Sequence, residues 1–165
     1  MHAPRDADPI EADALAMLWH DAWHEVHDTL VPSDLVALRT RDSFAARVVR
    51  VMAALRVAGP VGAPLGLCLA KGGELSQIFV APAGRGIGLA AGLMADAEDG
   101  MRADGFRTAG LVCAVGNRRA ARFYEKQGWR YIGTRPDMLE TTAGPYSLES
   151  WRYEKPLLDA GRAGR

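Results

Sequence analysis

Apolar residues in the first fifty positions of the chain recur at helical spacing. Residues 10–29 predict an amphipathic helix, because apolar side chains three and four positions apart share one face. That apolar stripe consists of Ile10, Ala14, Met17 and Leu18. Pro32 interrupts the pattern, since proline cannot continue a helix. A second helix is expected to begin near Asp42 or Ser43, either of which can cap it.

From about residue 54 the pattern changes to short apolar runs separated by glycine-rich turns. Three such runs occupy residues 55–58, 65–70 and 74–80. The connections Gly59-Pro60-Val61-Gly62 and Gly72-Gly73 favour tight turns between them. We therefore expect three strands that are joined as hairpins.

The rest of the chain alternates between helical and strand patterns. The expected elements are a helix over residues 89–104, a strand over 107–115, a short helix over 117–127, and strands over 129–133 and 151–155. The buried face of the longer helix is expected to carry Leu89, Leu93, Ala97 and Met101. Residues 134–150 have the composition of a loop. This alternation predicts an α/β or α+β fold, in which helices cover a sheet.

Length and charge narrow the class of protein. At 165 residues the chain is expected to form one domain over residues 1–165, with a disordered tail at residues 157–165. Lys and Arg number 20, as do Asp and Glu, so net charge provides no general attraction for nucleic acid or an anionic membrane. No apolar run approaches the ~20 residues of a membrane helix, and residues 1–13 lack the apolar segment of a signal peptide. We therefore expect a cytoplasmic protein that binds neither nucleic acid nor a membrane.

Two sets of side chains are candidate metal ligands. Cys68 and Cys113 fit neither a zinc spacing nor a disulfide framework, and both are expected to be buried thiols. His20, His24 and His27 lie on nearly one face of the first helix, a spacing that can chelate zinc. Neither a cysteine nor a clear third-ligand pattern accompanies them, so no metal is expected.

A glycine-rich segment joins the third strand to the following helix. The first N–H groups of a helix have no internal partner, and the helix dipole adds partial positive charge at the same end. Glycines also let an anion approach the main chain closely. The N–H groups of this segment can therefore cradle a pyrophosphate. The residues concerned are Arg85, Gly86, Ile87, Gly88 and Leu89.

Two other phosphate-binding loops agree less well with this segment. Residues 86–91 satisfy the pattern G-x-G-x-x-A, but a dinucleotide site also expects an acidic residue about 20 positions later, at the end of the next strand. That strand ends at Ala114-Val115-Gly116-Asn117, without a carboxylate. A P-loop requires Gly-Lys-Ser/Thr, which the sequence lacks. A dinucleotide-dependent oxidoreductase is therefore disfavoured.

Two segments between residues 74 and 133 resemble the GNAT acetyltransferases. The first reads E-L-S-Q-I-F-V-A-P-A-G-R-G-I-G-L-A and is similar to the acetyl-CoA loop Q/R-x-x-G-x-G/A, with Gly86 and Gly88 at its two small positions. The second reads N-R-R-A-A-R-F-Y-E-K-Q-G-W and fits the family motif N-x-x-A-x-x-F-Y-E-K-x-G-F/W. Ala83 stands where the family holds Gln or Arg, and Arg85 follows two positions later. The resemblance implies the acyl-CoA N-acyltransferase fold, a mostly antiparallel twisted sheet flanked by helices.

The same resemblance implies direct attack of an amine on the thioester of acetyl-CoA, without an acyl-enzyme. An alkyl amine with a pKa near ~10.4 must lose a proton, the carbonyl oxygen needs a donor, and the leaving thiolate benefits from an acid. The resemblance assigns Tyr124 as the acid near the sulfur. It assigns Glu74 as the base, acting directly or through water. A main-chain N–H near Phe79 or Val80 would stabilise the oxyanion.

The resemblance also implies which residues contact the two substrates. The expected acetyl-CoA contacts are Ile78, Phe79, Val80, Arg85, Gly86, Ile87, Gly88, Leu89, Asn117, Arg119 and Tyr124. The first helices wall the acceptor site in this family, so Trp23 and His27, together with Glu74, are expected to contact a small-molecule or peptide amine. A homodimer agrees with the family. The alternative function is a non-catalytic module that binds acyl-CoA.

Overall fold

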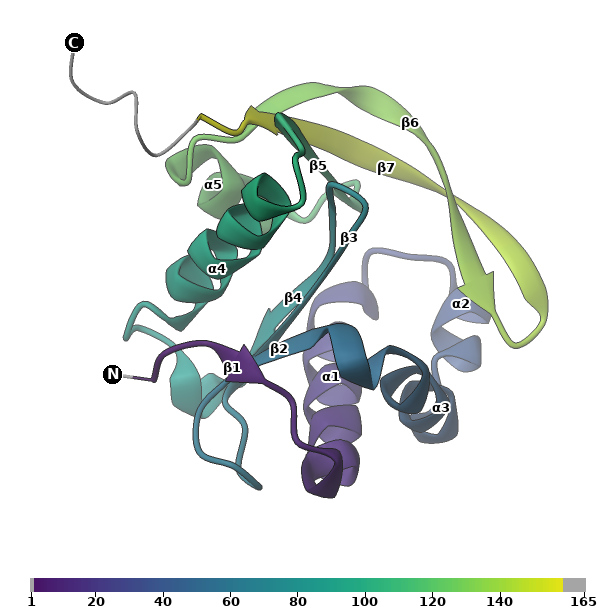
Figure 1. Cartoon of the computed structure of the whole chain (residues 1–165). Coiled ribbons are helices and arrows are strands. Elements are labelled where there is room, and N and C mark those ends of the chain that lie inside the picture. Colours follow the sequence, from purple (N-terminus) through teal and green to yellow (C-terminus); the bar gives the residue numbers. More distant parts are fainter. Residues whose placement is uncertain (1, 159–165) are drawn as a thin grey trace, which may run out of the picture.

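Seven strands form one mixed sheet in the order β1-β2-β3-β4-β5-β7-β6 (Figure 1). The computed structural model describes residues 2–158. The strands are β1 Arg5–Asp6, β2 Leu55–Ala58, β3 Gly66–Lys71, β4 Glu74–Val80, β5 Thr108–Ala114, β6 Arg130–Thr141 and β7 Gly144–Pro156. Only β4 and β5 run parallel, and every other neighbouring pair is antiparallel. The mostly antiparallel sheet predicted for this chain is therefore confirmed.

Helices cover both faces of the sheet and enclose two apolar cores. The helices are α1 Ala12–His27, α2 Ser33–Leu38, α3 Arg41–Val51, α4 Leu89–Ala103 and α5 Arg118–Lys126, and short 3₁₀ turns occupy Pro9–Glu11, Met52–Ala54 and Pro82–Gly84. On one face α4 and α5 pack around Leu93 and Leu111 (Figure 1). On the other face α1, α2 and α3 pack around Trp19 and Phe44. A ligand that enters between two strands can therefore contact helices from both layers.

The first helix is present, but its buried face differs from the predicted stripe. Residues Pro9–Glu11 form a 3₁₀ turn with a capping box on Asp8, and α1 begins only at Ala12. The change in winding turns Ile10 and Met17 to solvent, at 79% and 52% exposure. The residues that α1 buries are Leu15, Ala16, Leu18, Trp19, Ala22 and Trp23. The aromatic residues, not the predicted aliphatic stripe, therefore anchor this helix.

The connection after α1 contains a helix that the sequence pattern does not predict. Pro32 precedes α2 and its carbonyl accepts bonds from the amides of Leu35 and Val36, so the proline starts a short helix as well as ending α1. The next helix, α3, is capped by Thr40, whose hydroxyl accepts from the amide of Ser43. The predicted caps at Asp42 and Ser43 were therefore wrong by two to three positions.

The strands and helices of the central region agree closely with the pattern. Strands β2, β3 and β4 form the expected antiparallel hairpins. The buried residues of α4 include all four of the predicted apolar positions, and Asn117 caps α5 through the amide of Ala120 at 3.2 Å. Residues 134–150, expected to be a loop, instead belong to a long hairpin of β6 and β7 that extends toward α2 (Figure 1). There Tyr146 donates a hydrogen bond to Asp34, which ties the hairpin to α2.

The end of the described chain is packed, whereas a disordered tail was expected from residue 157. Leu157 is buried and its amide donates to the carbonyl of Arg107 at 2.8 Å. The remainder of the expected tail, residues 159–165, lies outside the described residues. Cys68 and Cys113 are both buried free thiols. Within residues 2–158, no helix has the length and apolar character needed to cross a membrane.

Candidate active site

The site begins where β4 and β5 separate. These parallel strands pair only at Glu74 with Gly110 and at Leu75 with Leu111, and then diverge. The space between the later residues of the two strands is a cavity of about 860 Å³. Beyond Leu75 the β4 main chain has no pairing partner in β5, so its amide and carbonyl groups on that edge are left for a ligand.

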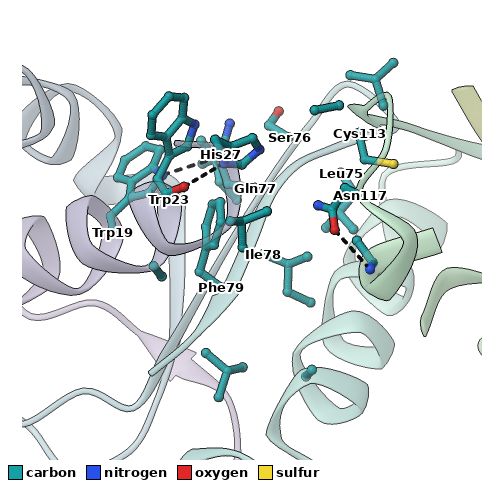
Figure 2. Close-up of a pocket in the computed structure, with 18 of the residues that line it drawn as sticks. Trp19, Trp23, His27, Leu75, Ser76, Gln77, Ile78, Phe79, Cys113 and Asn117 are labelled. Carbon is teal, nitrogen blue, oxygen red and sulfur yellow. Dashed lines mark hydrogen bonds between the residues drawn. The ribbon is translucent and has the colours of Figure 1, made fainter. Parts of the chain in front are cut away.

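A β-bulge lies at the start of this gap. In the register with β3, Gln77 pairs with Leu69 and Leu75 pairs with Ala70, which leaves Ser76 unpaired. The bulge lies about three residues before Phe79 and Val80, where the resemblance placed the oxyanion donor. The bulge directs Gln77 toward α1, where it accepts a hydrogen bond from Trp19 Nε1 at 3.3 Å (Figure 2).

The glycine-rich segment forms one end of the cavity. Gly86 and Gly88 have φ values of +77° and +81°, and no atom lies within 4 Å of a Cβ built at either position. Gly88 is the N-cap of α4, and its carbonyl accepts the helix bond from Gly92. The first amides of α4 therefore precede the helical hydrogen bonds and are free to hold an anion. The residues of this segment that line the cavity are Gly84, Arg85, Gly86, Gly88, Leu89, Ala90 and Ala91.

The geometry corrects the register in which the glycine motif was aligned. The pattern Q/R-x-x-G-x-G/A is satisfied in full by residues 85–90, with Arg85 first, Gly88 at the helix cap and Ala90 in the first turn. Ala83 lies in the preceding 3₁₀ turn and does not line the cavity. The apparent departure at Ala83 was therefore an alignment error of two positions. Ile87 is 56% exposed and its side chain does not line the cavity, although it was expected to contact acetyl-CoA.

Two arginines, Arg85 and Arg119, line the cavity near the glycine-rich segment. Arg85 donates two hydrogen bonds to the carboxylate of Glu25 on α1, at 2.9 and 2.7 Å. This pairing keeps the pKa of Glu25 below its ordinary value. Arg119 on α5 also lines the cavity, so the positive charge there does not depend on Arg85 alone.

Besides Arg119, helix α5 and its cap contribute two more of the predicted residues, Asn117 and Tyr124, to the cavity wall. Asn117 uses its Oδ1 atom for the cap of α5, so its amide nitrogen is the group left for a ligand (Figure 2). Tyr124 is 8% exposed, and its ring lies 5.8 Å from that of Tyr153. Burial raises the pKa of Tyr124 above its ordinary value, so the phenol is protonated at neutral pH and can donate a proton.

Glu74 does not lie where the resemblance placed it. It is absent from the residues that line the cavity. Its two carboxylate oxygens accept hydrogen bonds from Arg152 on β7, at 2.5 and 3.1 Å. Both oxygens are thus engaged by a guanidinium from another strand, away from the cavity lining. This placement disfavours Glu74 as the catalytic base and as an acceptor contact.

The opposite end of the cavity is formed by α1, which supplies Trp23 and His27 as predicted. The two rings stack at a centroid distance of 4.6 Å (Figure 2). Nδ1 of His27 lies 2.8 Å from the carbonyl of Trp23, an acceptor, so Nδ1 carries the proton and Nε2 keeps its lone pair. Burial lowers the pKa of His27 below its ordinary value; the hydrogen bond to the Trp23 carbonyl opposes this shift, and the smaller effects are lowering by Arg39 and His24 and raising by Asp28. His27 is therefore a neutral imidazole at neutral pH.

The histidines of α1 do not converge on one point. Nδ1 of His20 contacts Asp21, and His24 contacts Asp28 with Nδ1 and the Arg39 carbonyl with Nε2. Across residues 2–158, no three side chains from His, Cys, Asp and Glu are grouped as a metal ion would need. The ring nitrogens of His20 and His24 thus hold these two side chains in place on α1.

Two residues of the site, Arg39 and Arg47, were not predicted from the sequence. Both line the cavity at the end formed by α1, and Arg47 lies 4.3 Å from the centroid of the Trp19 ring. Arginines after a proline turn and inside a surface helix are ordinarily solvated, so their type alone carries no signal. The available hint was that Arg47 follows Phe44 by three positions and so shares the face that α3 buries.

Comparisons with known proteins agree with this geometry. Residues 17–129 match the Acetyltransferase (GNAT) family. No match was found among curated proteins.

Three similar structures share the fold at low identity. A GCN5-related N-acetyltransferase from Rhodopseudomonas palustris has a TM-score of 0.71 at 19% identity, covering 95% of this chain and 96% of that one. A phosphinothricin acetyltransferase from Sinorhizobium meliloti, in complex with acetyl-CoA, has a TM-score of 0.70 at 18% identity, covering 99% and 92%. A PaiA N-acetyltransferase from Thermoplasma acidophilum, in complex with coenzyme A, has a TM-score of 0.66 at 14% identity, covering 94% and 99%. The chain thus belongs to the GNAT family of acetyltransferases.

Proposed function

We propose that this protein transfers an acetyl group from acetyl-CoA to an amine by direct attack in a ternary complex. The observation that carries the proposal is one continuous cavity that joins the glycine-rich segment to the aromatic wall of α1 through the gap between β4 and β5. A diphosphate at the amides around Gly88 would place the pantetheine arm along β4, beside Ile78 and Val80. The thioester would then reach the bulge at Ser76, with the acceptor on the far side of the gap.

The transition state for this reaction carries negative charge on the carbonyl oxygen, which needs a donor. The β4 amides beyond Leu75 have no partner in β5 and are rigidly held by pairing with β3. We assign the oxyanion donor to an amide of this segment, next to the bulge at Ser76. A donor held by the sheet requires no reorganisation when the charge develops.

The attacking amine must also lose a proton, and we propose His27 as the base. Its Nε2 lone pair is kept available by the bond from Nδ1 to the Trp23 carbonyl, and the ring lines the cavity. Glu74 lacks both features, because Arg152 occupies its oxygens. Gln77 lines the same region but has no basic atom.

The leaving thiolate accepts a proton from Tyr124 in this proposal. Tyr124→Phe should lower kcat by about 10- to 100-fold while the KM for acetyl-CoA changes by less than about threefold, since the lost interaction forms mainly in the transition state. The effect is moderate because a thiol with a pKa near ~8.5 is a fair leaving group even without an acid. Steady-state kinetics at pH 7.5 would measure both constants. An unchanged kcat would remove Tyr124 from the mechanism.

Release of free coenzyme A thiol from acetyl-CoA tests the function directly. The purified protein should release thiol only when an amine acceptor is present, and mass spectrometry should detect the acetylated amine. A suitable panel contains amino acids, polyamines, aminoglycosides and peptides with free N-termini. Calorimetric binding of acetyl-CoA without thiol release over the whole panel would instead favour the alternative, a non-catalytic acyl-CoA-binding module.

A further inference from the structure

The acceptor end of the cavity contains two arginines that lack carboxylate partners. Arg39 is 5% exposed, and its side chain makes one hydrogen bond, from Nη1 to the main-chain carbonyl of Glu140 at 2.9 Å. Its Nε atom is buried without a partner. Within residues 2–158, the Arg47 side chain makes no hydrogen bond or ion pair, although its Nη1 atom is buried. A buried cation without a counter-charge is costly, so its presence points to a ligand.

Other arginines of this fold are paired with carboxylates, unlike Arg47. Four of them hold a carboxylate with two hydrogen bonds each. These pairs are Arg5 with Glu11, Arg56 with Asp96, Arg85 with Glu25, and Arg152 with Glu74. Arg47 has the same forked donor set and lines the cavity, but no carboxylate of residues 2–158 forms an equivalent pair with it.

Arg47 is also held in place before any ligand binds. Its guanidinium lies 4.3 Å from the centroid of the Trp19 ring and 5.4 Å from that of Phe44. Stacking of this kind fixes the plane of the guanidinium and leaves its edge free for hydrogen bonds. Burial lowers the pKa of Arg47 to about 10, so the group remains charged at neutral pH.

The surrounding charges favour an anion at this point. Arg39 and Arg50 lie near Arg47 and line the same cavity, as does Lys71. The facing carboxylates are Asp137 and Glu140 on β6, and neither accepts a hydrogen bond from Arg47. Apolar residues of the same cavity lining include Trp23, Met138 and Leu148.

We infer that the acceptor is an amine that also carries a carboxylate, namely an amino acid with an apolar side chain. Arg47 holds the carboxylate with two hydrogen bonds, and the apolar side chain lies against the aromatic residues of α1. The amine then points toward His27 and the gap between β4 and β5. This inference rests on the proposed acetyltransferase function and narrows its substrate class.

Three leucine derivatives test the inference by turnover. L-Leucine, L-leucinamide and 3-methylbutylamine share the side chain and the amine, but only leucine carries a carboxylate. The wild-type kcat/KM for leucine should exceed those for the other two by at least about tenfold, which is the range expected for a charge-assisted pair. L-Leucyl-L-leucine in the same assay distinguishes a free amino acid from the C-terminal carboxylate of a peptide. Equal or faster turnover of the amide or the amine would overturn the inference.

Variants at α3 assign the preference to Arg47. Arg47→Gln should reduce the ratio of kcat/KM for leucine to kcat/KM for 3-methylbutylamine to about one, and Arg47→Lys should retain part of the preference because it keeps the charge but loses the fork. Arg41→Gln is the matched control, since Arg41 is exposed on the same helix and does not line the cavity. Arg47→Gln is expected to fold, because it removes a buried unpaired charge. Retention of the full preference in Arg47→Gln would overturn the assignment.

A binding measurement keeps the inference separable from the proposed function. Calorimetry would compare N-acetyl-L-leucine with N-acetyl-L-leucinamide, which differ only in the carboxylate. Wild-type protein should bind the acid at least about tenfold more tightly, and Arg47→Gln should bind the two equally. If thiol release fails but this difference is found, the proposed function falls while the anion site stands. If the two ligands bind wild-type protein equally, the anion site falls.

Discussion

Gly86→Asp should raise the Kd for acetyl-CoA by at least about 100-fold, which is the largest binding effect expected from one substitution in this protein. The new carboxylate would lie beside the amides that hold the diphosphate. Two like charges about 5 Å apart repel by about 3 kcal/mol at an effective dielectric constant near 20, and about 2.7 kcal/mol corresponds to a factor of 100. Calorimetric titration with acetyl-CoA and with coenzyme A would measure the change.

Gly72→Asp is the control for this substitution. Gly72 lies in the turn between β3 and β4 with a φ of +59°, and an added Cβ would have no atom within 4 Å, as at Gly86. It does not line the cavity. Both variants therefore carry the same backbone strain and the same charge, and only the position differs. Acetyl-CoA binding within threefold of wild type in Gly86→Asp would contradict a phosphate site at this loop.

The helices and strands around the glycine-rich segment could be predicted from sequence, because residues at their ends determine where they begin and stop. Gly88 and Asn117 each mark the start of a helix, and the strand before the first of them has the expected bounds in the structure. The hairpin of β6 and β7 could not be predicted in the same way. Its outer half is exposed on alternate positions and contains Pro136 and Pro145, and it is stabilised by pairing between the two strands and by contacts with residues more than 100 positions earlier in the chain, such as that of Tyr146 with Asp34.

Some of the predicted site residues line the cavity, and others do not. Tyr124, Trp23 and His27, which the family resemblance assigned to the site, all line the cavity. Glu74 was predicted as the base, but its partner Arg152 is 78 positions away in the chain, and no local pattern reveals that pair. Arg47 was missed for the converse reason. Its significance is that no carboxylate of residues 2–158 pairs with it, which only the folded arrangement makes visible.

His27→Gln should lower kcat/KM at pH 7 by about 100-fold, the largest effect on catalysis expected here. At pH 7 an amine with a pKa near ~10.4 is deprotonated in only about one molecule in 2,500. The base that removes its proton is therefore expected to contribute more to the rate than the acid that protonates the leaving thiolate. Glutamine keeps the size and polarity of the side chain but cannot accept a proton. Its KM for acetyl-CoA should stay close to wild type, because His27 lies at the acceptor end of the cavity.

The pH profile separates a base from a packing residue. Burial lowers the pKa of His27, so wild-type kcat/KM should hold through neutral pH and fall only on the acid side of about 6.5, as the lone pair at Nε2 is protonated. In His27→Gln that acid limb should disappear, and activity should instead rise with pH toward the pKa of the amine. His20→Gln is the control, because His20 lies on the same helix but outside the cavity lining. An acid limb that survives unchanged in His27→Gln would show that another group takes the proton from the amine. The acceptor amine would then have no reason to point toward His27 on α1.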